Sequence, residues 1–557
     1  MRRLPLVPTR VSILLMTLTA CASSPTRDAP HVTFVGPRFD LGPDRSPALA
    51  VTVDARGRVV ALHGALPTPS ADRAFARVPG EVAVAGLGDA HLHLAWLARG
   101  AERVDLARAG SASDAATTVL AFARANPETT IVGGDGWDQT RWPGQAFPTA
   151  ADLAPDPYGR PIVLSRVDGH AVWLDAVALA RVADLLAIPS PPPERVLRDA
   201  AGAPTGVIVD PRAAIHERLT PTPTAADLRR WITRGLDLVA DAGLVEVHDM
   251  ATSPAELEVL VALAAEGPLP ARVVVYLDAS EGSFAWLAAR GPGPVIIGPD
   301  LEVRGVKLFA DGALGSRGAA LHAPYSDEPG HLGQATPPAD LTRDAVRAAA
   351  LGYDVAIHAI GDRGNTLALD ALEAAKARAT RPFRGRVEHA QVLDRAAVDR
   401  LVAGGFVASM QPTHATSDMR WAEARVGADR LTWAYAWRSL AAAGVALAFG
   451  SDAPVESFDP RLGLWAATRR QTPAGDPPDG WRAHEALSFV DAARAFSAGV
   501  AFAAQAERDR GALAVGQLLQ LSVFDRPPSE DLLAAVPVAT VRGRLVRAIR
   551  PIRPIQR

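Results

Sequence analysis

Two histidines separated by one residue are the first side chains in this sequence whose type and spacing suit the binding of a metal ion. His91 and His93 follow a short apolar segment and a Gly-Asp-Ala tripeptide. In an extended segment, side chains two positions apart point the same way, so both imidazoles can reach one ion. Most His-x-His pairs are ordinary surface or core histidines, and this pair alone therefore does not define a site.

Four more residues of metal-binding type stand within or at the ends of apolar segments. They are Lys307, His358, His389 and Asp452. Each has an ordinary explanation: an edge-strand lysine, two core histidines and a helix N-cap. Their joint order along the chain, at the ends of separate predicted strands, favours a common site. Imidazole and carboxylate ligands suit zinc or a similar divalent ion, and a lysine carbamate would bridge two ions.

The elements that must position these residues alternate between apolar strands and Ala-rich helices. This alternation is typical of an α/β fold with a parallel sheet. Eight such units predict a closed (β/α)8 barrel, in which functional residues gather at the carboxyl ends of the strands. The predicted strands are Val82–Leu87, Leu244–His248, Val273–Leu277, Val303–Phe309, Val355–His358, Arg386–Glu388, Phe406–Met410 and Val445–Phe449.

Segments outside the barrel pattern predict two further parts. Residues 31–84 and 511–557 contain short β segments, and we expect them to pair into one small β-sandwich made from both chain ends. The barrel would then occupy residues 85–510. Between its first and second strands lies an insertion of about 100–240, long enough to form a subdomain over the barrel mouth.

The N-terminus has the features of an exported lipoprotein. Arg2, Arg3 and Arg10 precede an apolar run, Val11–Thr19, that is too short to span a bilayer but suits a signal peptide. The run leads into Leu-Thr-Ala and then Cys21, which resembles a lipobox. We therefore expect a signal peptide at 1–20, a tether at 21–30 and a lipid anchor on Cys21 in the bacterial cell envelope, at the outer membrane in a two-membrane bacterium. A plain signal peptide is the alternative.

The composition narrows the classes of partner and of metal site that this chain could have. The 557 residues are 48% hydrophobic and 21% charged with a formal charge of −3, which gives no reason to expect nucleic acid as a partner. Cys21 is the only cysteine, so disulfides within the chain and thiolate metal sites are excluded. A metal must be held by histidine, carboxylate or modified lysine. The oligomeric state stays open, with a homodimer as one alternative.

Longer motifs make the chain resemble a known family. The sequence is similar to the amidohydrolase superfamily, and to its YtcJ-like (amidohydrolase 3) branch, which includes N-substituted formamide deformylase. The motifs span nearly the whole chain beyond the N-terminal segment. They are GDGWDQTRW at 134–142, RVDGHAVW at 166–173, VKLFADGALGSRGA at 306–319, IHAIGDR at 357–363, RVEHAQ at 386–391, ASMQPTHATSDMRW at 408–421 and GSDAPVE at 450–456.

The resemblance implies a divalent metal centre with one or two ions, of which zinc is the expected one. Asp452 would both bind metal and accept the proton of the attacking water, and Lys307 matches a position that is carboxylated in some members. The implied ligands are His91, His93, Lys307, His358, His389 and Asp452.

Further motif residues are candidates for contact with a small-molecule substrate. Arg317 could hold a carboxylate or carbonyl oxygen, and His414 could stabilise an oxyanion. Loop scaffolding through hydrogen bonds is the alternative for every one of them. The candidates are Trp137, Asp138, Asp168, His170, Asp311, Ser316, Arg317, Gln411 and His414.

The function predicted from these features is hydrolysis of a C–N bond in a small amide, formamide or cyclic amide. Deamination and ester or phosphoester cleavage are alternatives, since activated water serves all of them. A non-catalytic, surface-anchored binding protein is a third. The intact set of ligand residues favours an enzyme over the binding protein.

Overall fold

The computed structural model describes residues 31–549 except 41, 43–44, 71–72 and 192–193. The predicted signal peptide, the tether and Cys21 lie outside the described residues. In the part of the chain that is described, no helix combines the length and apolar character needed to cross a membrane.

Eight parallel strands form the centre of the molecule, which confirms the predicted α/β barrel. Each strand pairs in parallel with the next one along the chain. The barrel strands are β6 (Leu87–Leu92), β13 (Leu244–Thr252), β14 (Arg272–Leu277), β16 (Leu301–Phe309), β17 (Asp354–Ala359), β18 (Arg386–His389), β19 (Val407–Met410) and β20 (Ala446–Phe449).

The barrel is nearly closed, and its seam lies between the first and last strands. Leu92 forms an isolated parallel bridge with Ala453, just beyond β20. The Asp452 N–H donates to the His91 carbonyl at 2.6 Å, and the His93 N–H donates to the Ala453 carbonyl at 2.9 Å. Residues expected to bind metal therefore lie directly at the seam.

The first barrel strand differs from its predicted position. The sequence analysis placed it at Val82–Leu87, but Val82–Ala85 is β5 and belongs to another sheet, and the barrel strand is β6. The chain changes sheets at Gly86, where a Cβ atom would lie 2.5 Å from the Val245 side chain. The apolar pattern continues through this glycine, so it does not reveal the change.

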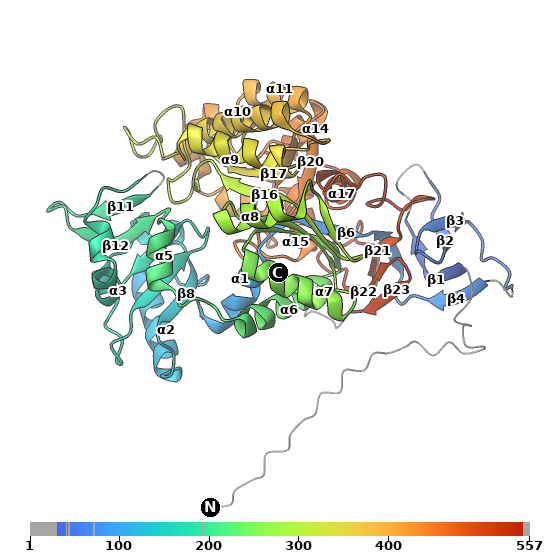
Figure 1. The fold of residues 1–557 in the computed structure, drawn as a ribbon, viewed down its shortest axis with the longest axis horizontal. Helices are drawn as coiled ribbons and strands as arrows, with labels where there is room; N and C mark the ends of the chain where they lie inside the picture. Colours follow the sequence, from blue (N-terminus) through green and yellow to red (C-terminus); the bar gives the residue numbers. More distant parts are fainter. Residues whose placement is uncertain (1–30, 41, 43–44, 71–72, 192–193, 550–557) are drawn as a thin grey trace, which may run out of the picture.

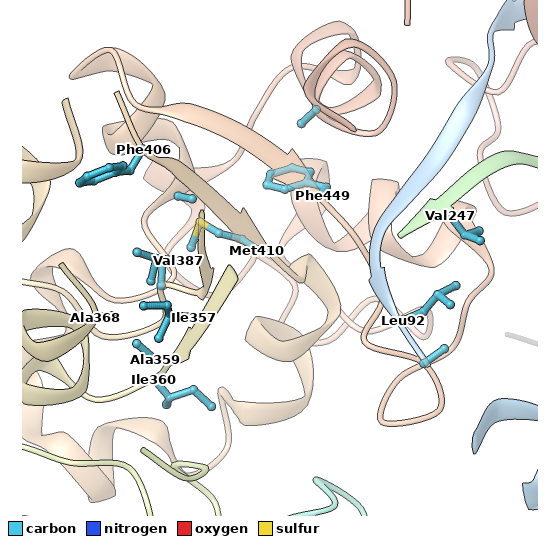
Figure 2. Close-up of a cluster of buried hydrophobic side chains, with 14 of the residues drawn as sticks. Leu92, Val247, Ile357, Ala359, Ile360, Ala368, Val387, Phe406, Met410 and Phe449 are labelled. Carbon is cyan, nitrogen blue, oxygen red and sulfur yellow. The ribbon is translucent and has the colours of Figure 1, made fainter. Parts of the chain in front are cut away.

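Helices surround the barrel, and the main core lies between helices and strands. Figure 2 shows Ile357 of β17 and Val387 of β18 on the same side as Ala368 of α10, with Phe406 close by. Alternate strand residues point inward, which leaves His358 on the inner face. The helices are α1 (Leu94–Arg99), α6 (Ala225–Asp241), α7 (Pro254–Glu266), α8 (Glu281–Arg290), α9 (Pro338–Ala350), α10 (Asp362–Arg378), α11 (Arg395–Gly404), α12 (Pro412–Asp418), α13 (Ala422–Arg430), α14 (Trp437–Ala442), α15 (Pro460–Arg469), α16 (Phe489–Ala495) and α17 (Ala498–Ala503).

Strands from both ends of the chain join in one eight-stranded sheet. The link between the two ends is β5, which pairs with β1 on one side and antiparallel with β21 on the other. A separate apolar cluster packs on this sheet. Besides β5, its strands are β1 (His31–Phe39), β2 (Ala48–Val53), β3 (Val59–His63), β4 (Arg73–Arg77), β21 (Gln520–Phe524), β22 (Pro537–Arg542) and β23 (Leu545–Ala548).

The insertion after the first barrel strand has its own six-stranded sheet. We call this sheet, together with the helices that pack on it, the lid. Figure 1 shows the lid (cyan) and the eight-stranded sheet (blue and red) on opposite sides of the barrel. Two apolar clusters give the lid its own core. Its strands are β7 (Val104–Asp105), β8 (Val132–Trp137), β9 (Ile162–Arg166), β10 (Ala171–Leu174), β11 (Arg195–Arg198) and β12 (Pro204–Val209), and its helices are α2 (Ala112–Ala125), α3 (Ala176–Arg181), α4 (Ala183–Leu186) and α5 (Ala213–Leu219).

Candidate metal centre at the barrel mouth

The seam of the barrel brings two histidines and one carboxylate together. His91 lies in β6, His93 follows it, and Asp452 follows β20. The Nε2 atoms of both histidines lie 3.3 Å from Oδ1 of Asp452. Their ligand-type atoms all lie within 4.8 Å of one another, which is close enough to surround one ion.

A second group of the same kind shares Asp452. It adds His389, the last residue of β18, and His414 from α12. The two imidazole rings are stacked with centroids 5.7 Å apart, and His414 Nε2 lies 3.7 Å from Asp452 Oδ2. One carboxylate thus faces two sets of histidines, an arrangement that offers places for one or two ions.

Hydrogen bonds on the far side of each ring fix which nitrogen faces the centre. His91 Nδ1 lies 2.7 Å from Glu388 Oε2, His93 Nδ1 lies 2.9 Å from the Met250 carbonyl, and His389 Nδ1 lies 2.8 Å from Gln411 Oε1. Since each acceptor requires a proton on Nδ1, each Nε2 presents its lone pair to the centre. Gln411 therefore orients His389, although the sequence analysis proposed it as a substrate contact.

A buried ion pair holds Glu388 in place. Both Glu388 and Arg386 are fully buried, and the Arg386 guanidinium donates to both oxygens of Glu388 at 2.7 and 3.1 Å. Arg386 also donates to the Ala90 carbonyl and the Ser409 hydroxyl. Burial opposes the charge on Glu388, but Arg386 and His91 hold the pKa of this carboxyl well below its usual range. The ring of His91 is thereby fixed against a permanent negative charge.

A third carboxylate ties the two strands of the seam together. Asp89 Oδ1 accepts from the backbone N–H of His91 and of Ser451, both at 3.0 Å, and Asp89 Oδ2 accepts from the Ser451 hydroxyl at 2.6 Å. A Cβ atom on Gly450 would lie 2.6 Å from Asp89 Oδ1, so glycine is required there.

Two of the ligand residues have left-handed backbone conformations. The φ angle is 72° at His389 and 61° at Asp452. Such angles are uncommon for residues with a side chain and concentrate at functional sites. They turn both side chains toward the barrel mouth where the strands end.

Lys307 lies beside the first group, on β16. It is 1% exposed, with Nζ 3.5 Å from His91 Nε2 and 5.1 Å from the centre of the Phe309 ring. Within the described residues no carboxylate oxygen lies within ion-pair distance of Nζ. Burial lowers the pKa of Lys307 to about 8, so part of the amine is uncharged near neutral pH, the form that carboxylation requires.

Burial keeps the surrounding imidazoles neutral. It lowers the pKa of His91 to about 4, with a further contribution from Lys307, and it lowers that of His389 well below its usual value. Burial opposes the charge on Asp452, but a proton held on a neighbouring histidine lowers the pKa of Asp452 below its ordinary range. Neutral imidazoles with an ionised carboxylate are the protonation states that a divalent ion needs.

His358 lies close to the centre but outside both tight groups. Its ring lies 4.6 Å from that of His389, centroid to centroid. Its Nε2 lies 3.4 Å from the Gly312 carbonyl and 3.6 Å from Asp311 Oδ1. The sequence analysis counted His358 among the implied ligands, whereas His414, predicted as a substrate contact, belongs to the second group.

A cavity of about 270 Å³ opens above these residues, between the barrel and the lid. The barrel contributes His358, His389, His414 and Asp452 to its wall. The lid contributes Asp138, Arg141, Arg166, Asp168 and His170. A small molecule bound there would contact both parts at once.

One arginine organises the acidic side chains of the lid. Arg166 is 2% exposed and donates to Gln139 Oε1 at 2.8 Å, to Asp138 Oδ1 at 2.9 Å and to Asp168. The predicted lid residues Asp138 and Asp168 therefore line the cavity as members of one charged network.

His170 is paired with Asp210 at the edge of the same cavity. Its Nδ1 lies 2.6 Å from Asp210 Oδ1, and its ring lies 4.8 Å from that of His358, centroid to centroid. Burial opposes a charge on this ring, but Asp210 and Asp168 raise the pKa of His170 to about 9. The ring is therefore positive at neutral pH, in contrast to the neutral imidazoles below it.

Four other predicted substrate contacts do not line the cavity. Trp137 is fully buried in the lid core and donates to the Leu164 carbonyl. Asp311 accepts from three backbone N–H groups and joins two loops, while Arg317 pairs with Asp327. Ser316 is buried and donates to the Ala313 carbonyl. Asp311, Ser316 and Arg317 thus scaffold loops, which was the alternative, and Trp137 packs in the lid core.

The sequence analysis missed several residues that shape the centre. Glu388 and Arg386 could have been found, because two charged residues on alternate positions of a short strand point to one face. Asp89 stands in the Gly-Asp-Ala tripeptide before His91, but the sequence analysis did not consider it as a link between strands. Asp210 carries no comparable signal, since its pairing with His170 depends on how the lid strands are arranged.

The residues present fit a divalent metal ion. Within the described chain, His414 Nε2 is buried without a hydrogen-bond partner, and the Nε2 atoms of His91 and His93 converge on one carboxylate oxygen. Unsatisfied buried polar atoms are costly unless a partner is supplied. The donor set of imidazole nitrogen and carboxylate oxygen matches zinc and similar ions.

The chain is similar in sequence and in fold to known proteins. The chain is 28% identical over 483 residues to YtcJ of Bacillus subtilis (strain 168), with 84% of this chain and 89% of that protein covered. It is 26% identical over 472 residues to N-substituted formamide deformylase of Arthrobacter pascens, with 81% and 84% covered. The fold matches an uncharacterized metal-dependent hydrolase from Pyrococcus horikoshii OT3 with a TM-score of 0.69 and 27% identity, covering 90% of this chain and 98% of that one.

A family model confirms the predicted resemblance. The model described as the amidohydrolase family matches residues 79–548, which include the whole barrel, the lid and all three C-terminal strands. Because this match covers far more than half of the sequence, the chain belongs to the amidohydrolase family.

Proposed function

We propose that this protein hydrolyses a C–N bond in a small amide, formamide or cyclic amide. The observation that carries the proposal is the position of Asp452 at the cavity wall, 3.3 Å from two imidazole nitrogens whose far sides are already bonded. Such a carboxylate is held both to bind an ion and to exchange a proton.

The chemistry divides between the ion and the chain. A divalent ion, for which we propose zinc, would lower the pKa of a water molecule toward neutrality and polarise a carbonyl group. Asp452 would accept the proton released when the water oxygen attacks the acyl carbon. It would then deliver that proton to the leaving nitrogen as the C–N bond breaks. Glu388, Gln411 and the Met250 carbonyl would keep the imidazoles oriented throughout.

Two observations support a small C–N substrate. The cavity of about 270 Å³ has room for a small molecule. N-substituted formamide deformylase, with which the chain shares 26% identity, is named for its action on formamides. The lid closes one side of the cavity and would keep bulk water away from the reacting bond.

The test begins with elemental analysis of the purified soluble domain, starting after Cys21. The metal-loaded protein is then offered N-formyl amines, N-acyl amines and cyclic amides, with esters, phosphoesters and aminopyrimidines as the competing classes. We expect zinc or a similar ion and turnover within the amide classes. Turnover only of esters, phosphoesters or aminopyrimidines would show that the protein cleaves another bond than the proposed one. A metal-loaded protein that turns over none of the compounds in the screen would favour a binding protein.

We also propose export and lipid anchoring through Cys21, on the basis of the lipobox-like sequence that ends at this residue. Cys21→Ser should move the protein from the membrane fraction to the soluble fraction without changing its turnover. The measurement is fractionation followed by an activity assay. Unchanged membrane association of the variant would contradict the anchor.

A further inference from the structure

One side chain of the lid, His170, reaches the cavity with a ring nitrogen that is not hydrogen-bonded to any described residue. His170 Nδ1 is bonded to Asp210, and its backbone N–H donates to Asp168 Oδ1 at 3.0 Å. Its Nε2 makes no hydrogen bond to any described residue, and the residue lines the cavity with 18% of its side chain exposed. A polar atom placed in this way is available to a bound molecule.

The position of His170 follows from the strands that flank it. His170 directly precedes β10, and Asp210 directly follows β12. These strands are antiparallel, with Ala171 opposite Val209, so His170 and Asp210 face each other at the next register position. The Asp210 N–H donates to the His170 carbonyl at 2.7 Å. The ring and its carboxylate are therefore set by backbone pairing.

The carboxylate of Asp210 lies against two glycines, in a space that any larger side chain at either position would fill. A Cβ atom on Gly312 would lie 2.2 Å from Asp210 Oδ2, and one on Gly318 would lie 2.4 Å away. Both glycines belong to the barrel loop after β16. Oδ2 is buried and has no hydrogen-bond partner among the described residues. A buried carboxylate with so few donors favours a positive ring as its neighbour.

We propose that His170 is a catalytic residue that donates a hydrogen bond from Nε2 to the acyl or carboxylate oxygen of the bound substrate, and that Asp210 positions it. His170 reaches the cavity from the lid, whereas Asp452 reaches it from the barrel seam. The barrel would thus accept the proton of the attacking water, and the lid would donate a hydrogen bond to the acyl oxygen. This inference rests on the proposed amide hydrolysis for its kinetic test.

A second contact between lid and barrel provides the matched control. Arg195 of β11 donates to Glu328 Oε1 at 2.8 Å and lies 2.9 Å from His331 Nε2. It fastens the lid to the same barrel loop but does not line the cavity. Arg195→Gln therefore weakens lid attachment without removing a group from the site.

The experiment compares kcat, KM and metal content of four variants on the best amide from the screen. His170→Ala should lower kcat about 10²–10³-fold, as the loss of one oxyanion donor does, with unchanged metal content. His170→Gln, which keeps an N–H donor, should recover part of this loss, and added imidazole should partly rescue His170→Ala. Asp210→Asn should lower kcat about tenfold, since its hydrogen bond to the ring loses the charge. Arg195→Gln should change it by less than about threefold.

Acetate binding to the metal-loaded protein, measured by calorimetry, gives a readout that does not need turnover. His170→Ala should bind acetate at least about tenfold more weakly than wild type, the loss of one charge-assisted hydrogen bond. Wild-type kcat in both His170 variants, or an equal loss in Arg195→Gln, would overturn the proposal. If the wild type hydrolyses no amide, the proposed function fails, and acetate binding alone decides: weaker binding by His170→Ala supports the inference, and equal binding overturns it.

Discussion

The barrel and the lid both supply polar groups to one cavity, but they hold these groups in different ways. The barrel residues expected to bind metal, His91, His93, His389 and Asp452, stand at strand ends, and buried acceptors orient the three imidazoles. The lid groups, Asp138, Asp168 and His170, are oriented through other side chains, Arg166 and Asp210. Metal binding should depend on the first set, and the handling of the substrate on the second.

Removal of two barrel ligands should have the largest effect. His91→Ala combined with His93→Ala takes two donors from one ion, so most bound metal and all measurable turnover should disappear. Elemental analysis of the purified variant is the measurement. The control is His63→Ala, because His63 lies in the eight-stranded sheet and should leave metal content at the wild-type level. Stoichiometric metal in the double variant would place the centre elsewhere.

Asp452→Asn should separate proton transfer from metal binding. Asparagine keeps an oxygen for the ion but cannot accept and return a proton, so kcat should fall about 10²–10⁴-fold at saturating metal. Metal content must be determined on the same sample, because a neutral ligand binds the ion more weakly. A variant with bound metal that turns over at the wild-type rate would rule out the proton-transfer role.

Glu388→Gln should weaken metal binding without removing a ligand. Loss of the charge behind His91 should lower metal affinity about 10–100-fold, measured by competition with a chelator. Arg386 would also lose its buried partner, so the melting temperature should fall. Glu485→Gln is the matched control: Glu485 is 1% exposed, is bonded to Ser439 and does not line the cavity. Equal metal affinity in both variants would show that Glu388 only stabilises the fold.

Arg166→Lys should have the smallest effect and should leave metal untouched. Lysine keeps the charge but cannot bond Asp138, Asp168 and Gln139 at once, so kcat/KM should fall about tenfold at wild-type metal content. Arg195→Lys, at the lid contact outside the cavity, should change kcat/KM much less. A loss of metal in Arg166→Lys would show that the lid shapes the metal centre as well. The barrel and the lid would then not have separate roles in metal binding and substrate handling.

The same difference explains what could be predicted from the sequence. Barrel strands alternate with helices at regular intervals, and residues at the ends of parallel strands meet at one mouth, so His91, His93, His389 and Asp452 were placed together correctly. The boundary of the first strand was misplaced because its apolar pattern runs through Gly86 without interruption.

The lid residues were harder to interpret, since nothing in the spacing of His170 and Asp210 shows that β10 and β12 pair antiparallel. Trp137 shares a motif with Asp138, yet one side chain fills the lid core and the other lines the cavity. Adjacent residues in an extended backbone point to opposite faces, and motif membership alone does not say which face is which. Side-chain networks such as that of Arg166 likewise become visible only once the tertiary contacts are known.

The position of the seam has a consequence for how the protein is made. Asp89 and Ser451, which are hydrogen-bonded across the seam, are 362 residues apart in the chain. During synthesis β6 leaves the ribosome early and β20 very late, so a growing chain carries His91 and His93 long before their carboxylate exists. The complete ligand set can therefore form only after the last barrel strand has docked beside the first. Metal capture would then mark a chain whose barrel has closed, and a fragment that ends before residue 452 should not acquire it.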